Sequence, residues 1–159
     1  LSPLLKALSI LPIKDFHLSV IGKERNMQEF MREAANLGLG DQVSFFGPRS
    51  DTRQFYQIAD SLVIPSYYDP FANVTVEALA MGLYVISSTS NGGHEILKEE
   101  MGTVIPDLKS RESFAQTLSL ALSKPKTWMR SQAIRKSVKH LDFSHQLSTL
   151  INISLERSG

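Results

Sequence analysis

Short apolar segments alternate with segments of helical periodicity, and this alternation limits the possible folds of the chain more than any other feature. The apolar runs predict strands at 16–22, 42–47, 61–66, 84–90 and 102–106. Apolar residues at helical spacing predict helices at 1–11, 26–39, 50–59 and 73–82, and from residue 110 onward at 110–123, 126–141 and 143–159.

Strands separated by helices favour a parallel sheet, because parallel strands need crossover connections that are usually helical. We therefore predict an α/β fold with a Rossmann-like, doubly wound parallel sheet. The length suits a single domain over residues 1–159. The chain opens on a predicted helix with no strand before it, so we expect a fragment of a longer protein.

Composition excludes several classes of function. A net charge of +1 gives no field that would favour nucleic acid as a partner. The absence of cysteine excludes disulfides and thiolate metal sites, and no apolar run approaches the roughly 20 residues that cross a bilayer. We expect a cytoplasmic protein.

The loop after the predicted strand 61–66 carries the main functional signal. Ligands of doubly wound sheets bind where strands end and loops lead into helices. Pro65 and Pro70 stiffen this loop, so the next helix can begin only near Asn73. The unpaired backbone N–H groups at residues 73–75, together with the helix dipole, suit a phosphate.

Two carboxylates flank that helix start. Glu77 lies one turn into the helix, and its oxygens suit the hydroxyls of a ribose better than a phosphate, which would repel it. Asp69 lies on the loop and could bind a second polyol on the other side of the phosphates. A phosphate between two groups rich in hydroxyls describes a nucleotide sugar.

These residues resemble a known family. The stretch "PSYYDPFANVTVEALAMGLYVISS", followed by "NGGHE", is similar to the signature of retaining glycosyltransferases of the GT-B fold, in which an acid, seven residues and a glutamate follow one another. The segments "LSPLLKALSILP", "FFGPRSD" and "GTVIP" extend the resemblance, which is closest to lipopolysaccharide core glucosyltransferases. It covers the C-terminal, donor-binding half of such enzymes.

The resemblance implies a role for each matching residue. Glu77 would hold the ribose and Asp69 the transferred sugar, which makes these two acids the catalytic pair, although the first acid of the family is usually glutamate. The other implied donor-binding residues are Gly22, Lys23, Arg49 beside the nucleobase, Phe71, Ala72, and the backbone of Asn73 and Val74 at the distal phosphate. The family's Arg-Lys pair would precede Leu1, and Lys23 and Arg25 are candidates to share its work.

The resemblance also implies the reaction. The full enzyme would transfer a hexose, for which we take UDP-glucose as the donor, to a glycan or lipopolysaccharide-type acceptor with retention and without an essential metal or other cofactor. The acceptor would bind the missing N-terminal domain together with its histidine, and we expect the isolated donor domain to be inactive. A different class, a nonenzymatic nucleotide-binding or interaction module of Rossmann type, stays open because the fold alone does not decide function.

Several residues also have purely structural interpretations. Glu77 could be an ordinary first-turn glutamate, Asp69 could initiate a turn, and Arg49 could be a solvated cation. Gly92 and Gly93 fit a tight turn better than a ligand contact. The basic stretch at 126–140 is typical of a solvated helix face with Trp128 packed on the core, and peripheral membrane contact through it is a weaker hypothesis.

Overall fold

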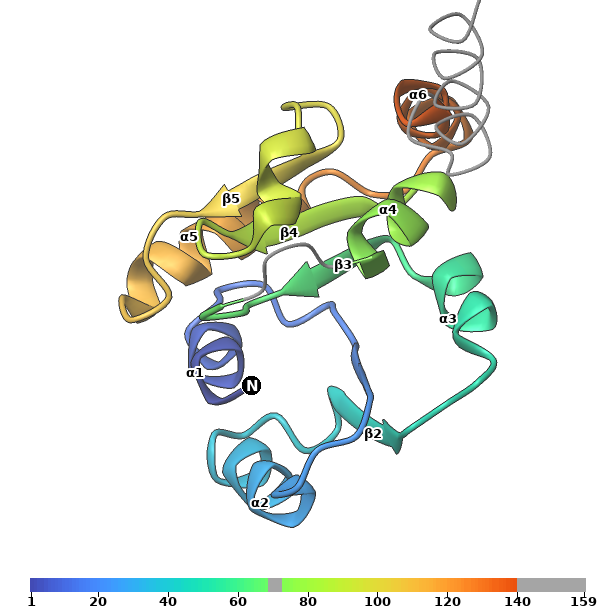
Figure 1. Cartoon of the computed structure of the whole chain (residues 1–159). Helices are drawn as coiled ribbons and strands as arrows, with labels where there is room; N and C mark the ends of the chain where they lie inside the picture. The colour runs from blue at the N-terminus through green and yellow to red at the C-terminus, as the bar shows by residue number, and fades with distance from the viewer. Residues whose placement is uncertain (69–72, 140–159) are drawn as a thin grey trace, which may run out of the picture.

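Strands and helices alternate along the chain as the periodicity predicts (Figure 1). The computed structural model describes residues 1–68 and 73–139. In chain order the elements are α1 (Ser2–Ser9), β1 (Leu18–Ile21), α2 (Met27–Asn36), β2 (Val43–Gly47), α3 (Thr52–Ile58), β3 (Ser61–Ile64), α4 (Asn73–Ala80), β4 (Tyr84–Ser88), the 3-10 helix η1 (Gly92–Ile96), β5 (Gly102–Ile105), α5 (Arg111–Leu122) and α6 (Trp128–Ser137).

Local signals set the helix ends. The Ser110 hydroxyl accepts a hydrogen bond from the backbone N–H of Ser113 and caps α5. Gly82 has a φ of 77° just after α4, a left-handed conformation that glycine adopts without strain. Asp51 stands at the N-cap of α3, but its side chain makes no cap hydrogen bond, and Arg49 engages its carboxylate instead.

All the strand pairs are parallel, and they form two sheets. β1 pairs with β2, while β4 lies between β3 and β5. All five residues of β4 are buried, as expected for a parallel strand covered on both faces. The predicted α/β class with parallel strands is confirmed, but the sheet is divided. In the described ranges no strand lies between β1 and β3, so these two edges do not join.

Helices cover both faces of the strands. On one face α1, α2 and α5 pack around a core that includes Leu5 and Phe114, and β4 contributes Tyr84 and Ile86 to it. On the other face α4 and α6 pack around Leu79 and Ile134, and β4 contributes Val85. This alternation along β4 is the doubly wound arrangement that the sequence predicts.

The C-terminal part differs from the prediction. The side chain of Trp128 was expected to pack on the core, yet Trp128 is the first residue of α6 and is 77% exposed. Ser131 and Ile134 supply the buried face of α6 instead. The helix predicted at 143–159 lies outside the described residues. Within residues 1–68 and 73–139, no helix is long and apolar enough to span a membrane.

Candidate functional site

The first turn of α4 is exposed where β3 ends. β3 stops at Ile64, and α4 begins at Asn73, as the prolines of the intervening loop predict. Asn73 and Val74 are exposed, whereas Thr75, Ala78 and Leu79 face the interior and anchor the helix. The N–H groups of this first turn have no partners within the helix. Such groups are able to bind an anion, and the helix dipole favours one there.

Glu77 is held by a contact that the sequence did not predict. The Tyr56 hydroxyl, on α3, donates a hydrogen bond to Glu77 Oε2 at 3.1 Å. Burial, together with the charge of Glu77 and this bond, raises the pKa of Tyr56 to about 12. The bond engages one carboxylate oxygen of an otherwise exposed side chain. Tyr56 thus restricts the orientation of Glu77, and Oε1 can still accept hydrogen bonds from a ligand.

Lys126 in turn secures the end of α3. Its ammonium group donates hydrogen bonds to the carbonyls of Tyr56, Gln57 and Ala59 at 3.0, 3.2 and 3.1 Å. Its backbone N–H binds Asp60 Oδ1 at 3.0 Å. Burial lowers the pKa of Lys126, and the charge of Arg135 adds to this effect. A cation on the last carbonyls of a helix is favourable, so Lys126 fixes the helix that presents Tyr56.

The loop after β4 packs closely against α4. A Cβ built on Gly93 would lie 2.6 Å from Thr75 Oγ1 and 3.0 Å from Asn91 Oδ1, so only glycine fits there. Asn91 Oδ1 accepts a hydrogen bond from the Gly93 N–H at 2.7 Å. Gly92 and Gly93 open η1, and the structural role predicted for this pair is consistent with the close packing of Gly93 on α4.

Three buried polar atoms lie in these same elements. Thr75 Oγ1, Ser87 Oγ and Asn91 Nδ2 have no hydrogen-bond partner within the described ranges. Such atoms are uncommon in folded proteins and are often satisfied by ordered water. They belong to α4, β4 and the start of η1, so the packing behind the first turn of α4 is polar as well as tight.

A second group of predicted residues gathers at the ends of β1 and β2. The Gly22 N–H donates to the Gly47 carbonyl at 2.9 Å, which brings the Gly22-Lys23 loop beside the loop that carries Arg49. Gly22 has a φ of 136°, which favours glycine, and Lys23 is exposed. Within the described residues, no hydrogen bond or ion pair joins this group to α4. Asp69, Phe71 and Ala72 lie outside those residues.

Arg49 binds a neighbouring carboxylate. Its Nε and a terminal nitrogen each donate to Asp51 at 2.9 Å, a bidentate pair. The hydrogen bonding raises the pKa of Arg49 and lowers that of Asp51. The guanidinium carbon also lies 6.0 Å from the centre of the Phe55 ring. A contact between Arg49 and a nucleobase would have to keep or replace this pair.

Cations of the basic stretch at 126–140 also bind the protein itself. Besides Lys126, Arg130 donates to the Pro125 carbonyl at 2.7 Å and Arg135 to the Met81 carbonyl at 3.2 Å. The Arg130 contact is exposed and local, and membrane contact through this helix stays a prediction. Within the described part of the chain, no cluster of three or more acidic or histidine side chains could hold a metal ion.

Comparison with known proteins identifies the family. Residues 1–140 match the family model "Glycosyl transferases group 1". The chain belongs to this family. The predicted group 1 glycosyltransferase family is thereby confirmed. The matched range includes the residues of both groups, from Gly22 to Glu77.

Individual group 1 relatives agree. The chain is 32% identical over 123 residues to the lipopolysaccharide glucosyltransferase WaaG of Escherichia coli, covering 75% of this chain and 33% of WaaG. It is 29% identical over 115 residues to the lipopolysaccharide core biosynthesis glycosyltransferase LpsE of Rhizobium meliloti, covering 72% of this chain and 33% of LpsE. The chain therefore spans about a third of the length of these curated relatives.

Solved structures give the same fold. A crystal structure of WaaG matches with a TM-score of 0.72 and 27% identity, covering 87% of this chain and 37% of that one. The Anabaena protein HepE, crystallised with UDP and glucose, matches with a TM-score of 0.74 over 97% of this chain and 44% of HepE. At 19% identity, the likeness to HepE establishes the fold alone.

Proposed function

We propose that this chain is the donor-binding part of a hexosyltransferase that uses a nucleotide-diphosphate sugar. The observation that carries the proposal is the exposed first turn of α4, with Glu77 one turn further along and held by Tyr56. The amides of Asn73 and Val74 bind the distal phosphate, and Glu77 accepts hydrogen bonds from the ribose. Asp69 contacts the transferred sugar.

The finer assignments rest on the relatives. UDP-glucose as donor follows the names of WaaG and of the HepE complex. Transfer to a glycan or lipopolysaccharide-type acceptor, with retention and without an essential metal, follows the family resemblance. The acceptor binds a separate N-terminal domain, and the isolated donor domain is inactive, because transfer needs both substrates held together.

Calorimetry of the 159-residue chain with UDP and UDP-glucose tests the assignment of Glu77. Hydrogen bonds to a charged group contribute about 1.5–3 kcal/mol, so Glu77→Ala should weaken UDP binding on the order of 10- to 100-fold. Glu112→Ala is the matched control, because Glu112 is an exposed glutamate near the start of another helix, α5. Equal affinities of Glu77→Ala and the unmodified chain would remove Glu77 from the site.

A second variant tests the phosphate contact separately. Asn73→Pro deletes one amide of the first turn at a position where helices accept proline. Arg111→Pro makes the same change at the first residue of α5 and reports the structural cost alone. We expect only Asn73→Pro to weaken binding of UDP, and to leave binding of uridine, which has no phosphate, unchanged. Equal losses for UDP and uridine would contradict the phosphate assignment.

A further inference from the structure

No cation of the described residues pairs with Glu77. Within residues 1–68 and 73–139 its carboxylate accepts one hydrogen bond, from the Tyr56 hydroxyl, and takes part in no ion pair. Lys126 and Arg135 are engaged instead by backbone carbonyls near the ends of α3 and α4. A carboxylate that is oriented but not neutralised suits uncharged donors, such as the hydroxyls of a sugar.

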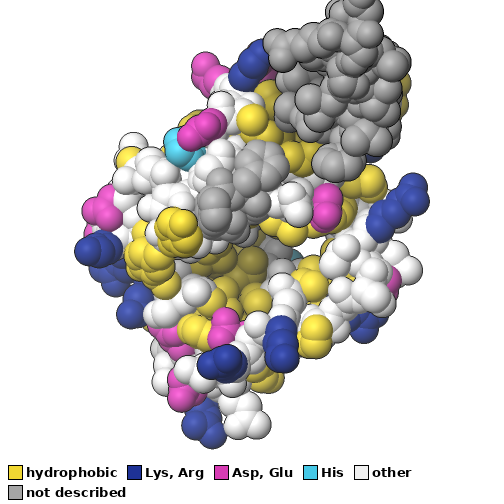
Figure 2. Space-filling view, in the orientation of Figure 1, with side chains coloured by type: hydrophobic (Ala, Val, Ile, Leu, Met, Phe, Trp, Pro, Cys, Tyr) yellow, Lys and Arg dark blue, Asp and Glu magenta, His cyan; other side chains and the backbone are white. Residues whose placement is uncertain are grey.

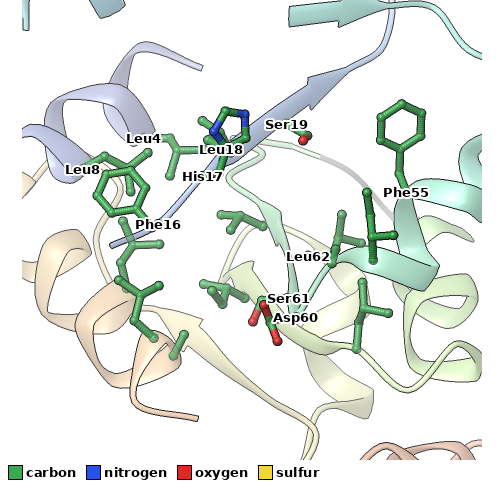
Figure 3. A pocket seen from close by; sticks show the side chains of 18 of the residues that line it. Leu4, Leu8, Phe16, His17, Leu18, Ser19, Phe55, Asp60, Ser61 and Leu62 are labelled. Atoms are coloured by element: carbon green, nitrogen blue, oxygen red, sulfur yellow. The ribbon is translucent and has the colours of Figure 1, made fainter. Parts of the chain in front are cut away.

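The ring of Tyr56 lies against two apolar surfaces. It lines a cavity of about 430 Å³ between the two sheets, where Figure 3 labels its neighbour Phe55. In the space-filling view the molecule is hollowed here, and hydrophobic side chains are visible at depth (Figure 2). The ring also packs against the core that α4 and α6 share. Packing therefore fixes the ring, and the hydroxyl is the end that reaches α4.

The hydroxyl of Tyr56 has one polar contact in the part of the chain that the structure describes. That contact is Glu77 Oε2, at 3.1 Å. A tyrosine side chain has fewer rotatable bonds than a glutamate side chain, and the Tyr56 ring is half-buried whereas Glu77 is exposed. The hydrogen bond therefore restricts the more mobile side chain by means of the more rigid one.

The backbone that carries Tyr56 is secured separately. Lys126 donates hydrogen bonds to the carbonyl of Tyr56 itself, at 3.0 Å, and to that of Ala59, at 3.1 Å. The backbone N–H of Lys126 binds Asp60, the residue that follows Ala59. Both the main chain and the ring of Tyr56 are thus held, so its hydroxyl has a defined position relative to α4.

A fixed partner on one oxygen leaves the other oxygen of Glu77 free in a defined orientation. A carboxylate offers two oxygens with about four lone-pair sites, and Tyr56 occupies one of those on Oε2. Ordering a mobile glutamate side chain when a ligand binds costs entropy, and the Tyr56 bond imposes part of that order beforehand. Two hydroxyls on neighbouring carbons can then bind the same carboxylate without a further rearrangement of Glu77.

We propose that Tyr56 is a positioning residue that makes the site select nucleotides with both ribose hydroxyls. The inference rests on the proposed role of Glu77 as the ribose contact and extends it, because the selection depends on Tyr56 as well. Tyr56 does not touch the nucleotide in this arrangement. It acts through the carboxylate of Glu77, which it holds in the orientation that accepts the two hydroxyls.

The orientation of Glu77 matters for selection as well as for affinity. A site built to hydrogen-bond a hydroxyl rejects the analogue that lacks it, because the polar group of the site then stays unpaired. An exposed glutamate that rotates freely can turn to water and loses little when the hydroxyl is absent. A glutamate that Tyr56 holds in place cannot turn away, so it penalises a nucleotide without ribose hydroxyls.

Calorimetry of the 159-residue chain with UDP and with dideoxy-UDP, which lacks both ribose hydroxyls, tests the proposal. We expect the unmodified chain to prefer UDP on the order of 10-fold or more. Tyr56→Phe should reduce this preference on the order of 3- to 10-fold by weakening the binding of UDP alone. Tyr84→Phe is the matched control, because it removes the hydroxyl of another tyrosine, which lies in the other core beside Lys124. Equal losses for the two nucleotides in Tyr56→Phe, or an unchanged preference, would overturn the proposal.

Two further measurements make every outcome decisive. If Glu77→Ala binds UDP as the unmodified chain does, the proposed function itself fails; if Glu77→Ala weakens UDP while Tyr56→Phe keeps the full preference, only the role of Tyr56 fails. Nuclear magnetic resonance of the unmodified chain gives an answer even where Tyr56→Phe does not fold. UDP should change the chemical shift of the hydroxyl-bearing ring carbon of Tyr56 more than dideoxy-UDP does, because the ribose hydroxyls share its acceptor. Equal changes with the two nucleotides would refute the role of Tyr56.

Discussion

The hydrogen bond between Tyr56 and Glu77 can be tested by titrating the tyrosine. Burial is the main cause that raises the pKa of Tyr56 to about 12, and the negative charge of Glu77 adds to it. At a pH of about 11, an ordinary tyrosine with a pKa near 10 is roughly nine-tenths ionised, whereas Tyr56 should be roughly one-tenth ionised. The difference in tyrosinate absorbance between the unmodified chain and Tyr56→Phe isolates this one side chain.

Removing the charge of Glu77 separates the two causes. Glu77→Gln keeps the size of the side chain and an acceptor oxygen, so the pKa of Tyr56 should fall but stay above 10, because burial remains. Glu112→Gln removes one carboxylate elsewhere and should leave the titration of Tyr56 unchanged. If Tyr56 titrates identically in the unmodified chain and in Glu77→Gln, the contact is absent and the account of how Glu77 is oriented is wrong.

The same shift predicts how stability depends on pH. The pKa of Tyr56 is higher in the folded chain than in the unfolded chain, so the folded chain holds its proton more tightly. The stability that the folded chain gains from the protonated Tyr56 is complete below a pH of about 10 and is lost as the pH rises towards 12. A pKa raised from 10.0 to about 12 corresponds to about 2.7 kcal/mol, and the partial exposure of Tyr56 reduces this to roughly 1 kcal/mol. The free energy of unfolding of Tyr56→Phe, measured in urea, should not show this loss of stability as the pH rises from about 10 towards 12.

Two structural variants follow from the same site. Lys126→Met removes three hydrogen bonds from the end of α3, so it should lower the free energy of unfolding, measured in urea, by roughly 1–2 kcal/mol. Lys136→Met is the control. An unchanged urea midpoint of Lys126→Met would show that Lys126 does not secure α3. Gly93→Ala places a methyl group 2.6 Å from Thr75 Oγ1 and should cost about 1–3 kcal/mol, whereas Gly40→Ala, where no atom lies within 4 Å, should cost little. Equal costs for the two glycines would contradict the close packing behind α4.

The sequence predicted the elements of the fold because their signals are local. The burial of all of β4 follows from its continuous apolar and small residues, and the start of α4 at Asn73 follows from the prolines before it. The left-handed turn at Gly82 is likewise local, because a glycine ends the helical pattern at 73–82. The position of Glu77 one turn into α4 needed no tertiary information.

Contacts between distant segments could not be predicted in this way. Tyr56 lies 21 residues before Glu77, and Lys126 binds carbonyls almost 70 residues earlier, so no spacing rule connects them. Trp128 was expected to be buried because tryptophan usually is, but its place at the first position of α6 turns it outward. Arg49 was expected to be either a ligand-binding residue or a solvated cation. The structure instead pairs it with Asp51, two residues away.

The division of the sheet and the geometry of the site meet in helix α3. Tyr56 lines the cavity between the sheets and also donates the hydrogen bond to Glu77. Because α3 has no buried residue, its position depends heavily on the hydrogen bonds from Lys126. Loss of these hydrogen bonds in Lys126→Met should therefore also loosen the hold of Tyr56 on the carboxylate of Glu77.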